Sequence, residues 1–275
     1  MGDSIEIRVH GSPGVPTVVY LPGIHGDWTL VTGFRLALGE RVRFVEFSYP
    51  RTIKWSVADY ASAVTRALVE AEVSRGWMVG ESFGSQVAWA VFENAATTKS
   101  GGAKFRPEGL VLAGGFVRHP WIAAVRWVRL WFSRAPQWAL GGFLLLYRAY
   151  SRFRFRRSPV NLSACDEFLE RRRRAGERAA ITHRLDLIID TDLRSAARSI
   201  EAPVLSLTGF WDPIVPWPWV RAWLRRECPG WRGERILAWA DHTVLVTQPV
   251  KSAEIVWKWI SDGLVTQSRA TSNSR

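Results

Sequence analysis

The chain has 275 residues, of which 47% are hydrophobic and 23% are charged, and its formal net charge is +12. This balance is typical of a globular protein that buries a sizeable core, and it excludes a disordered or fibrous chain. The length suits one large α/β domain with an insertion.

Seven short apolar or β-branched runs alternate with helical patterns along the chain. Several of these runs are continuously apolar, which indicates strands covered on both faces, as in a parallel sheet. The sequence therefore predicts an α/β fold, a three-layer sandwich with a mostly parallel central sheet of about seven strands. The predicted strands are IEIRV (5–9), TVVYL (17–21), VRFVEF (42–47), WMVG (77–80), GLVLAG (109–114), PVLSLTG (203–209) and RILAWA (235–240).

Helical patterns fill the intervals between these strands. We expect a helix over 56–75, with Ser56 as its N-cap, and a closing helix over 249–260. After Gly115 the alternation stops, and residues 116–199 carry helical, Arg-rich and aromatic sequence with no clear strand. We interpret residues 1–115 and 200–262 as one core, residues 116–199 as an inserted helical cap, and residues 263–275 as a disordered tail.

Most of the net charge comes from the inserted segment. No acidic residue occurs between Glu108 and Asp166. A basic chain can attract nucleic acid, but a charge concentrated in one aromatic-rich insertion argues against nucleic acid as the partner. The arginines of this interval are Arg118, Arg126, Arg129, Arg134, Arg148, Arg152, Arg154, Arg156 and Arg157.

No sequence motif implies a cofactor. The chain has no G-x-x-x-x-G-K-[ST] phosphate loop, no G-x-G-x-x-G after the first strand, and no H-E-x-x-H or paired cysteine ligand set. Cys165 and Cys228 lie far apart and are expected to be reduced, structural thiols. The start MGDSIEIRVH lacks the features of a secretory signal, and the longest charge-free apolar run, 135–147, is too short to span a bilayer. We expect a cytoplasmic protein without a cofactor or metal.

The pentapeptide GESFG, residues 80–84, follows a predicted strand and precedes a helical pattern. A serine nucleophile must protrude from a sharp strand-to-helix turn, where flanking side chains would collide with backbone, and Gly80 and Gly84 remove those side chains. Ser82 would then lie at the helix N-terminus, where the helix dipole stabilises developing negative charge. A glycine-rich turn with an N-capping serine is the alternative, so a catalytic role requires partners.

A serine hydroxyl is a weak nucleophile that needs a base within hydrogen-bond reach and an acid to orient the base. Of the five histidines, His242 alone follows a late strand at a loop. Asp212 follows another late strand, at the carboxyl edge where open α/β sheets build their sites. Asp241 adjoins His242 and would point away from it, while Asp190 and Asp192 are better interpreted as helix caps.

The chain order Ser82, Asp212, His242 is that of the α/β hydrolases, and from about residue 17 to residue 260 the chain resembles this superfamily in its capped form. The resemblance implies that Ser82 is the nucleophile and His242 the general base and acid. Asp212 would be the carboxylate that orients the imidazole. The nucleophile elbow implied by the motif consists of Gly80, Glu81 and Gly84 around the serine.

The stretch YLPGIHGDW begins at the end of the second predicted strand. Members of the superfamily carry a glycine-containing turn here, often His-Gly, and the next backbone N–H joins that of the residue after the nucleophile in the oxyanion hole. The resemblance therefore implies Phe83 and Ile24 as donors, with Pro22-Gly23 as the turn, while His25-Gly26 offers a second register. His25 is itself expected on the surface or in a loop. The same is expected of the other three histidines, His10, His119 and His183.

Aromatic and apolar residues recur at helical spacing in the inserted segment, with arginines among them. One interpretation is a helix pair whose aromatic residues pack on the core while the arginines stay solvated. An apolar cap over a serine site also favours a hydrophobic acyl group. Basic, tryptophan-rich helices suit peripheral contact with an anionic membrane, and an anionic substrate such as an acyl thioester of coenzyme A is a third alternative. The recurring residues are Trp121, Val125, Val128 and Phe132.

These observations together predict a serine hydrolase, cytoplasmic or membrane-associated. It would cleave a carboxylic ester or thioester of a small-molecule acyl substrate through an acyl-enzyme intermediate. The same triad serves acyltransferases, peptidases and carbon–carbon bond hydrolases, which stay open. A non-catalytic scaffold that binds lipid, nucleic acid or protein through the basic cap is a different class of function that also stays open.

Overall fold

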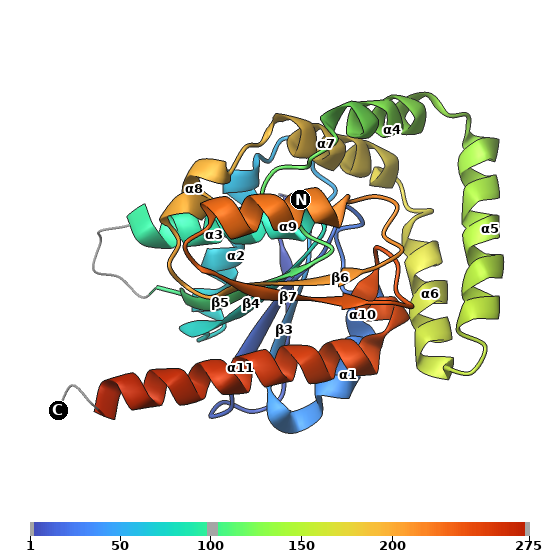
Figure 1. The fold of residues 1–275 in the computed structure, drawn as a ribbon. Coiled ribbons are helices and arrows are strands. Elements are labelled where there is room, and N and C mark those ends of the chain that lie inside the picture. The colour runs from blue at the N-terminus through green and yellow to red at the C-terminus, as the bar shows by residue number, and fades with distance from the viewer. Residues whose placement is uncertain (1–2, 98–103, 273–275) are drawn as a thin grey trace.

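The computed structural model describes residues 3–97 and 104–272, without the side chains of Thr97 and of residues 264–272. Its centre is one seven-stranded sheet with the order β1-β3-β2-β4-β5-β6-β7, in which β1 is antiparallel to β3 and the other neighbours are parallel. The predicted α/β sandwich is therefore confirmed (Figure 1). The strands are β1 (Glu6–His10), β2 (Thr17–Leu21), β3 (Arg43–Ser48), β4 (Arg75–Glu81), β5 (Arg106–Ala113), β6 (Val204–Gly209) and β7 (Trp231–Leu237).

Helices cover both faces of the sheet, because alternate residues of a strand point to opposite faces. In β2, Val19 and Leu21 belong to the apolar core shared with α2 and α3, whereas Val18 and Tyr20 belong to the core shared with α1 and α11. Figure 1 shows α1 and α11 on one side of the sheet and α2, α3 and α9 on the other. These helices are α1 (Thr32–Leu38), α2 (Val57–Glu70), α3 (Phe83–Thr97), α9 (Trp217–Glu227) and α11 (Pro249–Ser272), with the short helices η1 (Thr29–Val31), η2 (Gly39–Arg41) and α10 (Val244–Thr247) between them.

The N-terminus of α2 has the predicted cap. Ser56 Oγ accepts the Asp59 N–H at 3.2 Å, and Asp59 Oδ2 accepts the Ser56 N–H at 2.8 Å, which is a capping box. The predicted end at residue 75 is too late, because α2 ends at Glu70 and Glu72 turns the chain back toward β4 with a left-handed φ of 57°.

The last strand is the least accurately predicted one. The sequence placed it at 235–240, whereas β7 spans Trp231–Leu237 and pairs with β6 along that length. β7 is an edge strand of the sheet and its residues are largely half-exposed or exposed. Its charged sequence, WRGER, therefore lacks the apolar run that marks a central strand.

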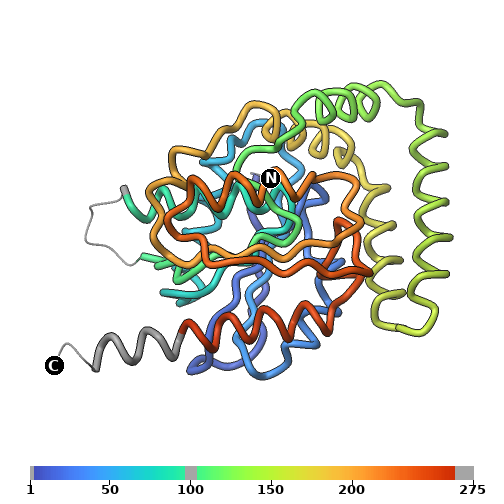
Figure 2. The backbone as a smooth tube through the Cα atoms, viewed as in Figure 1, coloured from blue at the N-terminus to red at the C-terminus, as the bar shows by residue number. Residues whose placement is uncertain are grey.

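Residues 116–199, here called the helical segment, contain five helices and no strand. Figure 1 shows α5 as the outermost helix, with α6 between it and the core, and Figure 2 follows the backbone out from β5 and back to β6. No helix in the described part of the chain is both long and apolar enough to cross a membrane. The five helices are α4 (Ile122–Arg134), α5 (Gln137–Arg154), α6 (Pro159–Arg171), α7 (Glu177–Asp190) and α8 (Arg194–Ser199).

The C-terminal helix α11 begins at Pro249, as predicted, and is assigned as far as Ser272. It therefore overlaps the residues for which the sequence suggested a disordered tail, 263–275. The side chains after Gly263 lie outside the described residues.

Candidate active site

Ser82 lies in the turn between β4 and α3, at the carboxyl edge of the sheet. Its φ of 49° is left-handed, which is a strained conformation for a residue with a side chain. A Cβ on Gly80 would lie 2.7 Å from Ser85 Cα, and a Cβ on Gly84 would lie 2.1 Å from the Leu21 carbonyl oxygen. The turn that holds the serine therefore requires both glycines.

Ser85, which the sequence did not mark as important, ties this turn to the residues that follow β5. Its hydroxyl donates to the Ser82 carbonyl at 2.6 Å and accepts the Phe116 N–H at 2.9 Å. The Ser82 N–H donates to the Ala113 carbonyl at 3.1 Å. A serine in the first turn of a helix is common, so the sequence carried no signal that could have distinguished it.

Asp212 and His242 come from the loops after β6 and β7, and the structure brings their side chains together. Asp212 Oδ2 lies 2.9 Å from His242 Nδ1, and Asp212 Oδ1 accepts the N–H groups of Ile214 and Val215, each at 2.9 Å. An ionised carboxylate only accepts hydrogen bonds, so we assign the proton to Nδ1 and the free lone pair to Nε2. A general base needs this tautomer.

His242 lies beside the turn that carries Ser82. The Ser82 N–H binds the carbonyl of Ala113, and Gly114 is the next residue. A Cβ on Gly114 would lie 3.2 Å from His242 Nδ1. Ser82 is 8% exposed and His242 is 9% exposed. Among the hydrogen bonds of the described residues, none joins the Ser82 hydroxyl to the imidazole. Such bonds are often long in unliganded enzymes and tighten when substrate binds.

Burial and three acidic groups act on the His242 imidazole. Burial disfavours the imidazolium and lowers the pKa of His242. The hydrogen bond and charge of Asp212, with the charges of Glu81 and Asp241, outweigh burial and raise this pKa above its ordinary value of 6.5. The same charges stabilise the imidazolium that forms when His242 takes a proton.

The loop after β2 makes a tight turn next to Ser82. The Gly26 N–H donates to the Gly23 carbonyl at 2.9 Å, and Gly26 has a φ of 75°. A Cβ on Gly23 would lie 3.3 Å from Ser82 Cβ, whereas a Cβ on Gly26 would lie 2.5 Å from Arg184 Nη1. Gly23 is thus the glycine that faces the serine, which favours the register with Ile24 as the donor over the alternative one.

Two arginines of the helical segment hold this loop by its carbonyl oxygens. Arg184, from α7, donates to the Ile24 carbonyl at 2.9 Å and to the Pro50 carbonyl at 2.9 Å. Arg172, at the end of α6, donates to the His25 carbonyl at 2.6 Å. Since these oxygens are held in place, the peptide planes of the loop are held as well.

Buried ion pairs fix Arg172 in turn. Its guanidinium contacts the carboxylates of Asp27 and Glu177, and Arg51 reaches Glu177 at 2.8 Å. Burial alone would raise the pKa of Asp27, but the charges of His25 and Arg172 and the hydrogen bonds from Thr29 keep it below its ordinary value. No sequence pattern predicts this cluster, because a buried arginine in RRRRAGERAAITHRLD looks the same as a solvated one.

Glu81, predicted only as part of the turn, is a buried carboxylate beneath the site. The Tyr20 hydroxyl donates to Oε2, and Oε1 has no hydrogen-bond partner among the described residues. Burial and the Glu81 charge raise the pKa of Tyr20 well above its usual value. The Glu81 charge also favours the protonated forms of His25 and His242, although burial leaves the pKa of His25 lowered overall.

The competing acids do not orient His242. Asp241 accepts the Thr243 N–H at 2.9 Å, and Asp192 pairs with Arg118 and Arg194. Among the described residues, no three His, Cys, Asp or Glu side chains gather in a way that could hold a metal ion.

His119 lies in the loop between β5 and α4, as predicted, but its side chain is buried rather than on the surface. It accepts the Trp121 N–H at Nδ1, so Nε2 carries the proton and donates to the Ile214 carbonyl at 3.2 Å. His119 therefore braces the loop that carries Asp212. Burial lowers the pKa of His119, which favours this neutral form.

Comparison with solved structures shows the fold of the α/β hydrolases over nearly the whole chain. The chain is similar to a hydrolase from Pseudomonas aeruginosa, with a TM-score of 0.73 and 21% identity, over 94% of this chain and 95% of that one. It is also similar to a thermophilic esterase from Thermogutta terrifontis, with a TM-score of 0.72 and 17% identity, over 94% and 93% of the two chains. An enol-lactonase from Burkholderia xenovorans gives a TM-score of 0.66 and 18% identity, over 95% and 96%.

No protein-family model and no curated protein matches the sequence. At 17–21% identity, the structural likeness confirms the predicted fold, and the reaction has to be argued from the residues of the site.

Proposed function

We propose that the chain is a serine hydrolase that cleaves a carboxylic ester or thioester, with Ser82, His242 and Asp212 as its catalytic triad. One observation carries this proposal: the His242–Asp212 hydrogen bond of 2.9 Å lies at the sheet edge where the strained Ser82 is held. The neighbours described as an esterase and an enol-lactonase support ester chemistry on this fold.

The reaction proceeds through an acyl-enzyme. Ser82 Oγ attacks the substrate carbonyl carbon while His242 Nε2 takes the hydroxyl proton, and Asp212 stabilises the imidazolium. His242 then protonates the leaving group, which departs as an alcohol or a thiol. Water attacks the acyl-enzyme as His242 removes its proton, the acid is released, and Ser82 regains its proton.

The proposed oxyanion donors are the N–H groups of Phe83 and Ile24. Phe83 is the first residue of α3, and the first N–H groups of a helix have no partner within the helix. For Ile24, the support is that Gly23 faces Ser82, while the Gly26 N–H is already used in the turn. Each donor would lower the barrier by about 3 kcal/mol.

We further propose a hydrophobic acyl group, with the helical segment acting as a cap. Trp211 and Trp239 follow β6 and β7, within a few residues of Asp212 and His242, and both are exposed. Large apolar side chains at the loops that carry a triad offer binding surface for an acyl chain. The contacts of Arg172 and Arg184 with the loop beside Ser82 support the view that the cap is part of the site.

Covalent labelling with a fluorophosphonate tests the nucleophile. We expect the wild type and Ser163→Ala, which changes an exposed serine of α6, to be labelled, and Ser82→Ala to remain unlabelled. A Ser82→Ala variant that folds and still labels would refute the assignment. A wild type that stays unlabelled, with and without detergent, would indicate a non-catalytic scaffold.

A series of p-nitrophenyl esters of increasing chain length then tests the acyl preference. We expect kcat/KM to rise from acetate to a longer optimum, since each buried methylene contributes about 0.8 kcal/mol. A preference for acetate would contradict the hydrophobic acyl group while leaving the triad intact. Added alcohols that receive the acyl group in place of water would mark the enzyme as an acyltransferase.

A further inference from the structure

The outward face of α5 is apolar, the reverse of an ordinary surface helix. Residues spaced by seven, eight and fifteen positions lie on one face of a helix. On α5 these are Trp138, Leu145, Leu146 and Phe153, which are 79%, 59%, 72% and 71% exposed. The opposite side does the packing: Tyr147 contacts Phe168 of α6, with ring centroids 5.4 Å apart.

Helix α4, which precedes α5 in the chain, also exposes large apolar side chains. Its exposed residues include Trp127, Leu130 and Trp131, and its only fully buried one is Val125. Twelve of the 21 exposed large hydrophobic side chains in the described chain lie between residues 121 and 160. Such a concentration marks an interaction surface, because monomeric proteins rarely leave large apolar patches uncovered. We call the outward side chains of α4 and α5 the outer face.

The charge around the outer face is positive and largely unpaired. No acidic residue occurs between Glu108 and Asp166. Acids from elsewhere pair with Arg129 and Arg148, but other arginines of α4, α5 and the turn after α5 form no ion pair among the described residues. These are Arg126, Arg134, Arg152, Arg154, Arg156 and Arg157.

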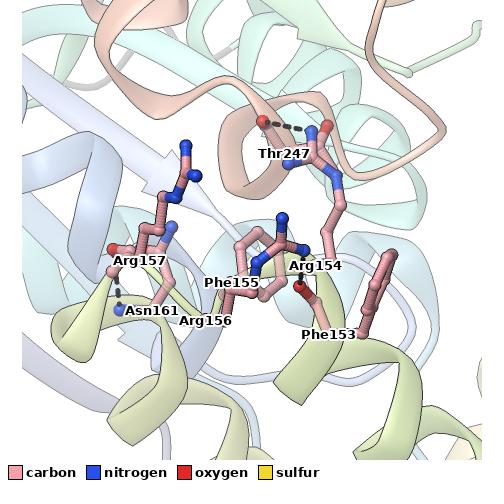
Figure 3. Close-up of a pocket in the computed structure, with 8 residues that line it drawn as sticks. Phe153, Arg154, Phe155, Arg156, Arg157, Asn161 and Thr247 are labelled. Carbon is pink, nitrogen blue, oxygen red and sulfur yellow. Dashed lines mark hydrogen bonds between the residues drawn. The ribbon is translucent and has the colours of Figure 1, made fainter.

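A pocket of about 570 Å³ opens where α5 ends and α6 begins, and no carboxylate lines it. Figure 3 shows the guanidinium groups of Arg154, Arg156 and Arg157 between Thr247 and the start of α6. Arg154 donates to the Thr247 carbonyl at 3.2 Å and Arg156 to the Phe153 carbonyl at 3.2 Å. The N-terminus of the thirteen-residue α6 adds its own positive end. This set of donors fits a phosphate group.

We propose that the outer face docks onto a membrane surface that contains anionic phospholipid, with a headgroup phosphate in the arginine pocket. Leucines and tryptophans on one face, surrounded by arginines, are what an interfacial helix needs. Phe153 belongs both to the outer face and to the pocket wall. The protein can therefore contact the acyl region of the lipid and its headgroup phosphate at the same time. Nucleic acid would satisfy the arginines but not the exposed leucines, and a second copy would bring two positive faces together.

Vesicle sedimentation tests this proposal, which goes beyond the proposed hydrolysis and does not depend on it. The full chain is mixed with vesicles of phosphatidylcholine alone or of phosphatidylcholine with phosphatidylglycerol. We expect binding only to the anionic vesicles, weakened by salt as the Debye length falls from about 8 Å at 0.15 M to about 3 Å at 1 M.

Two sets of variants separate the apolar and the charged contributions. Trp138→Ser, Leu146→Ser and Phe153→Ser combined should weaken partitioning by roughly an order of magnitude or more. Arg156→Gln with Arg157→Gln should weaken it about 25-fold, from roughly fivefold per arginine. The Tm of each variant should stay within about 2 °C of wild type, because all five side chains are exposed.

Matched controls change exposed residues elsewhere. Leu36→Ser with Val250→Ser on α1 and α11, and Arg66→Gln with Arg225→Gln on α2 and α9, should bind like wild type. Ser82→Ala should also bind like wild type, so binding and hydrolysis report separately. Equal binding to both vesicles, binding to neither, or controls that weaken binding as much as the outer-face variants would overturn the proposal. Tighter binding to duplex DNA than to anionic vesicles would assign the face to nucleic acid instead.

Discussion

The two halves of the helical segment both contain several arginines but lie in opposite environments. The inner half, α6 and α7, buries residues such as Leu185 and Ile188 in the core and places Arg184 against the loop beside Ser82. The outer half, α4 and α5, fully buries only Val125 and Ser151 within its helices. Both halves are rich in arginine, so arginine content alone does not say which half serves the site.

The hydrogen-bond partners of the arginines account for the different environments of the two halves. A buried guanidinium is stable only when its donors are satisfied, and Arg184 finds the carbonyls of Ile24 and Pro50. Most arginines around the outer half are exposed and form no ion pair among the described residues. The inner half is therefore part of the proposed catalytic machinery, whereas the outer half is a surface, and each of the following substitutions tests that division.

The largest effect is expected for Arg184→Met, which keeps the length of the side chain and removes its donors. Two half-buried carbonyls lose their partners, at a cost of up to about 1–3 kcal/mol each, and the Ile24 peptide is no longer fixed. We expect a lower Tm and a kcat on p-nitrophenyl esters reduced about a hundredfold, comparable to the loss of an oxyanion donor.

Arg184→Lys is the matched control for this substitution. It keeps the charge and one donor, so kcat should fall less than in Arg184→Met, with KM little changed in both. If Arg184→Met lowers the Tm but retains the wild-type kcat, Arg184 is only a structural residue and the inner half is not part of the site.

A leucine pair tests the packing of the two halves directly. Leu185 of α7 is 5% exposed and Leu146 of α5 is 72% exposed. Leu185→Ala should lower the free energy of unfolding by about 3 kcal/mol, because it leaves a cavity, whereas Leu146→Ala should change it by less than about 0.5 kcal/mol. Denaturant unfolding measures both. A large loss of stability in Leu146→Ala would mean that α5 is packed rather than displayed.

The fold was predictable because its signals are local. The apolar runs of the central strands, the Ser56 cap and the glycines around Ser82 each act within a few residues, and their positions in the structure agree with the sequence. The prediction was less accurate at β7, an edge strand with polar residues. One of the alternatives for the helical segment, in which its aromatic residues pack on the core, does not hold for Trp121, which is exposed.

The sequence predicted the contact between Asp212 and His242 but not the residues that support the site around them. Asp212 and His242 each follow a strand, and the topology alone brings such residues to one edge of the sheet. Arg184 meets Ile24 across 160 positions of sequence, and His119 meets Ile214 across 95. These contacts depend on how the helical segment returns to the core, and no local pattern specifies that path.

A pair of glycine substitutions tests the contact between Arg184 and the loop beside Ser82 by changing the loop rather than the arginine. Gly26 and Gly39 both have positive φ, but a Cβ on Gly26 would lie 2.5 Å from Arg184 Nη1, while a Cβ on Gly39 would meet nothing within 4 Å. Gly39→Ala should cost about 1 kcal/mol of stability from backbone strain alone. Gly26→Ala should cost about 1–2 kcal/mol more and reduce kcat about tenfold, since it displaces the guanidinium. Equal effects in the two variants would show that the loop tolerates displacement of Arg184.

The smallest effect expected is a shift in the pH dependence of kcat/KM. His242 must be neutral to act as a base, so activity falls as the pH drops below its pKa, and this acid limb should lie above pH 6.5 because the pKa is raised. Glu81→Gln should move the limb to lower pH, since the Glu81 charge raises the pKa of His242, while the amide oxygen can still accept from Tyr20.

Arg184→Lys completes this test, because it should lower kcat and leave the acid limb where it is. The acidic charges that raise the pKa of His242 are those of Asp212, Glu81 and Asp241, whereas Arg184 acts on the carbonyls of the loop beside Ser82. A limb that moves in Arg184→Lys, or stays in Glu81→Gln, would mean that the inner half of the helical segment acts on the base rather than on the oxyanion loop.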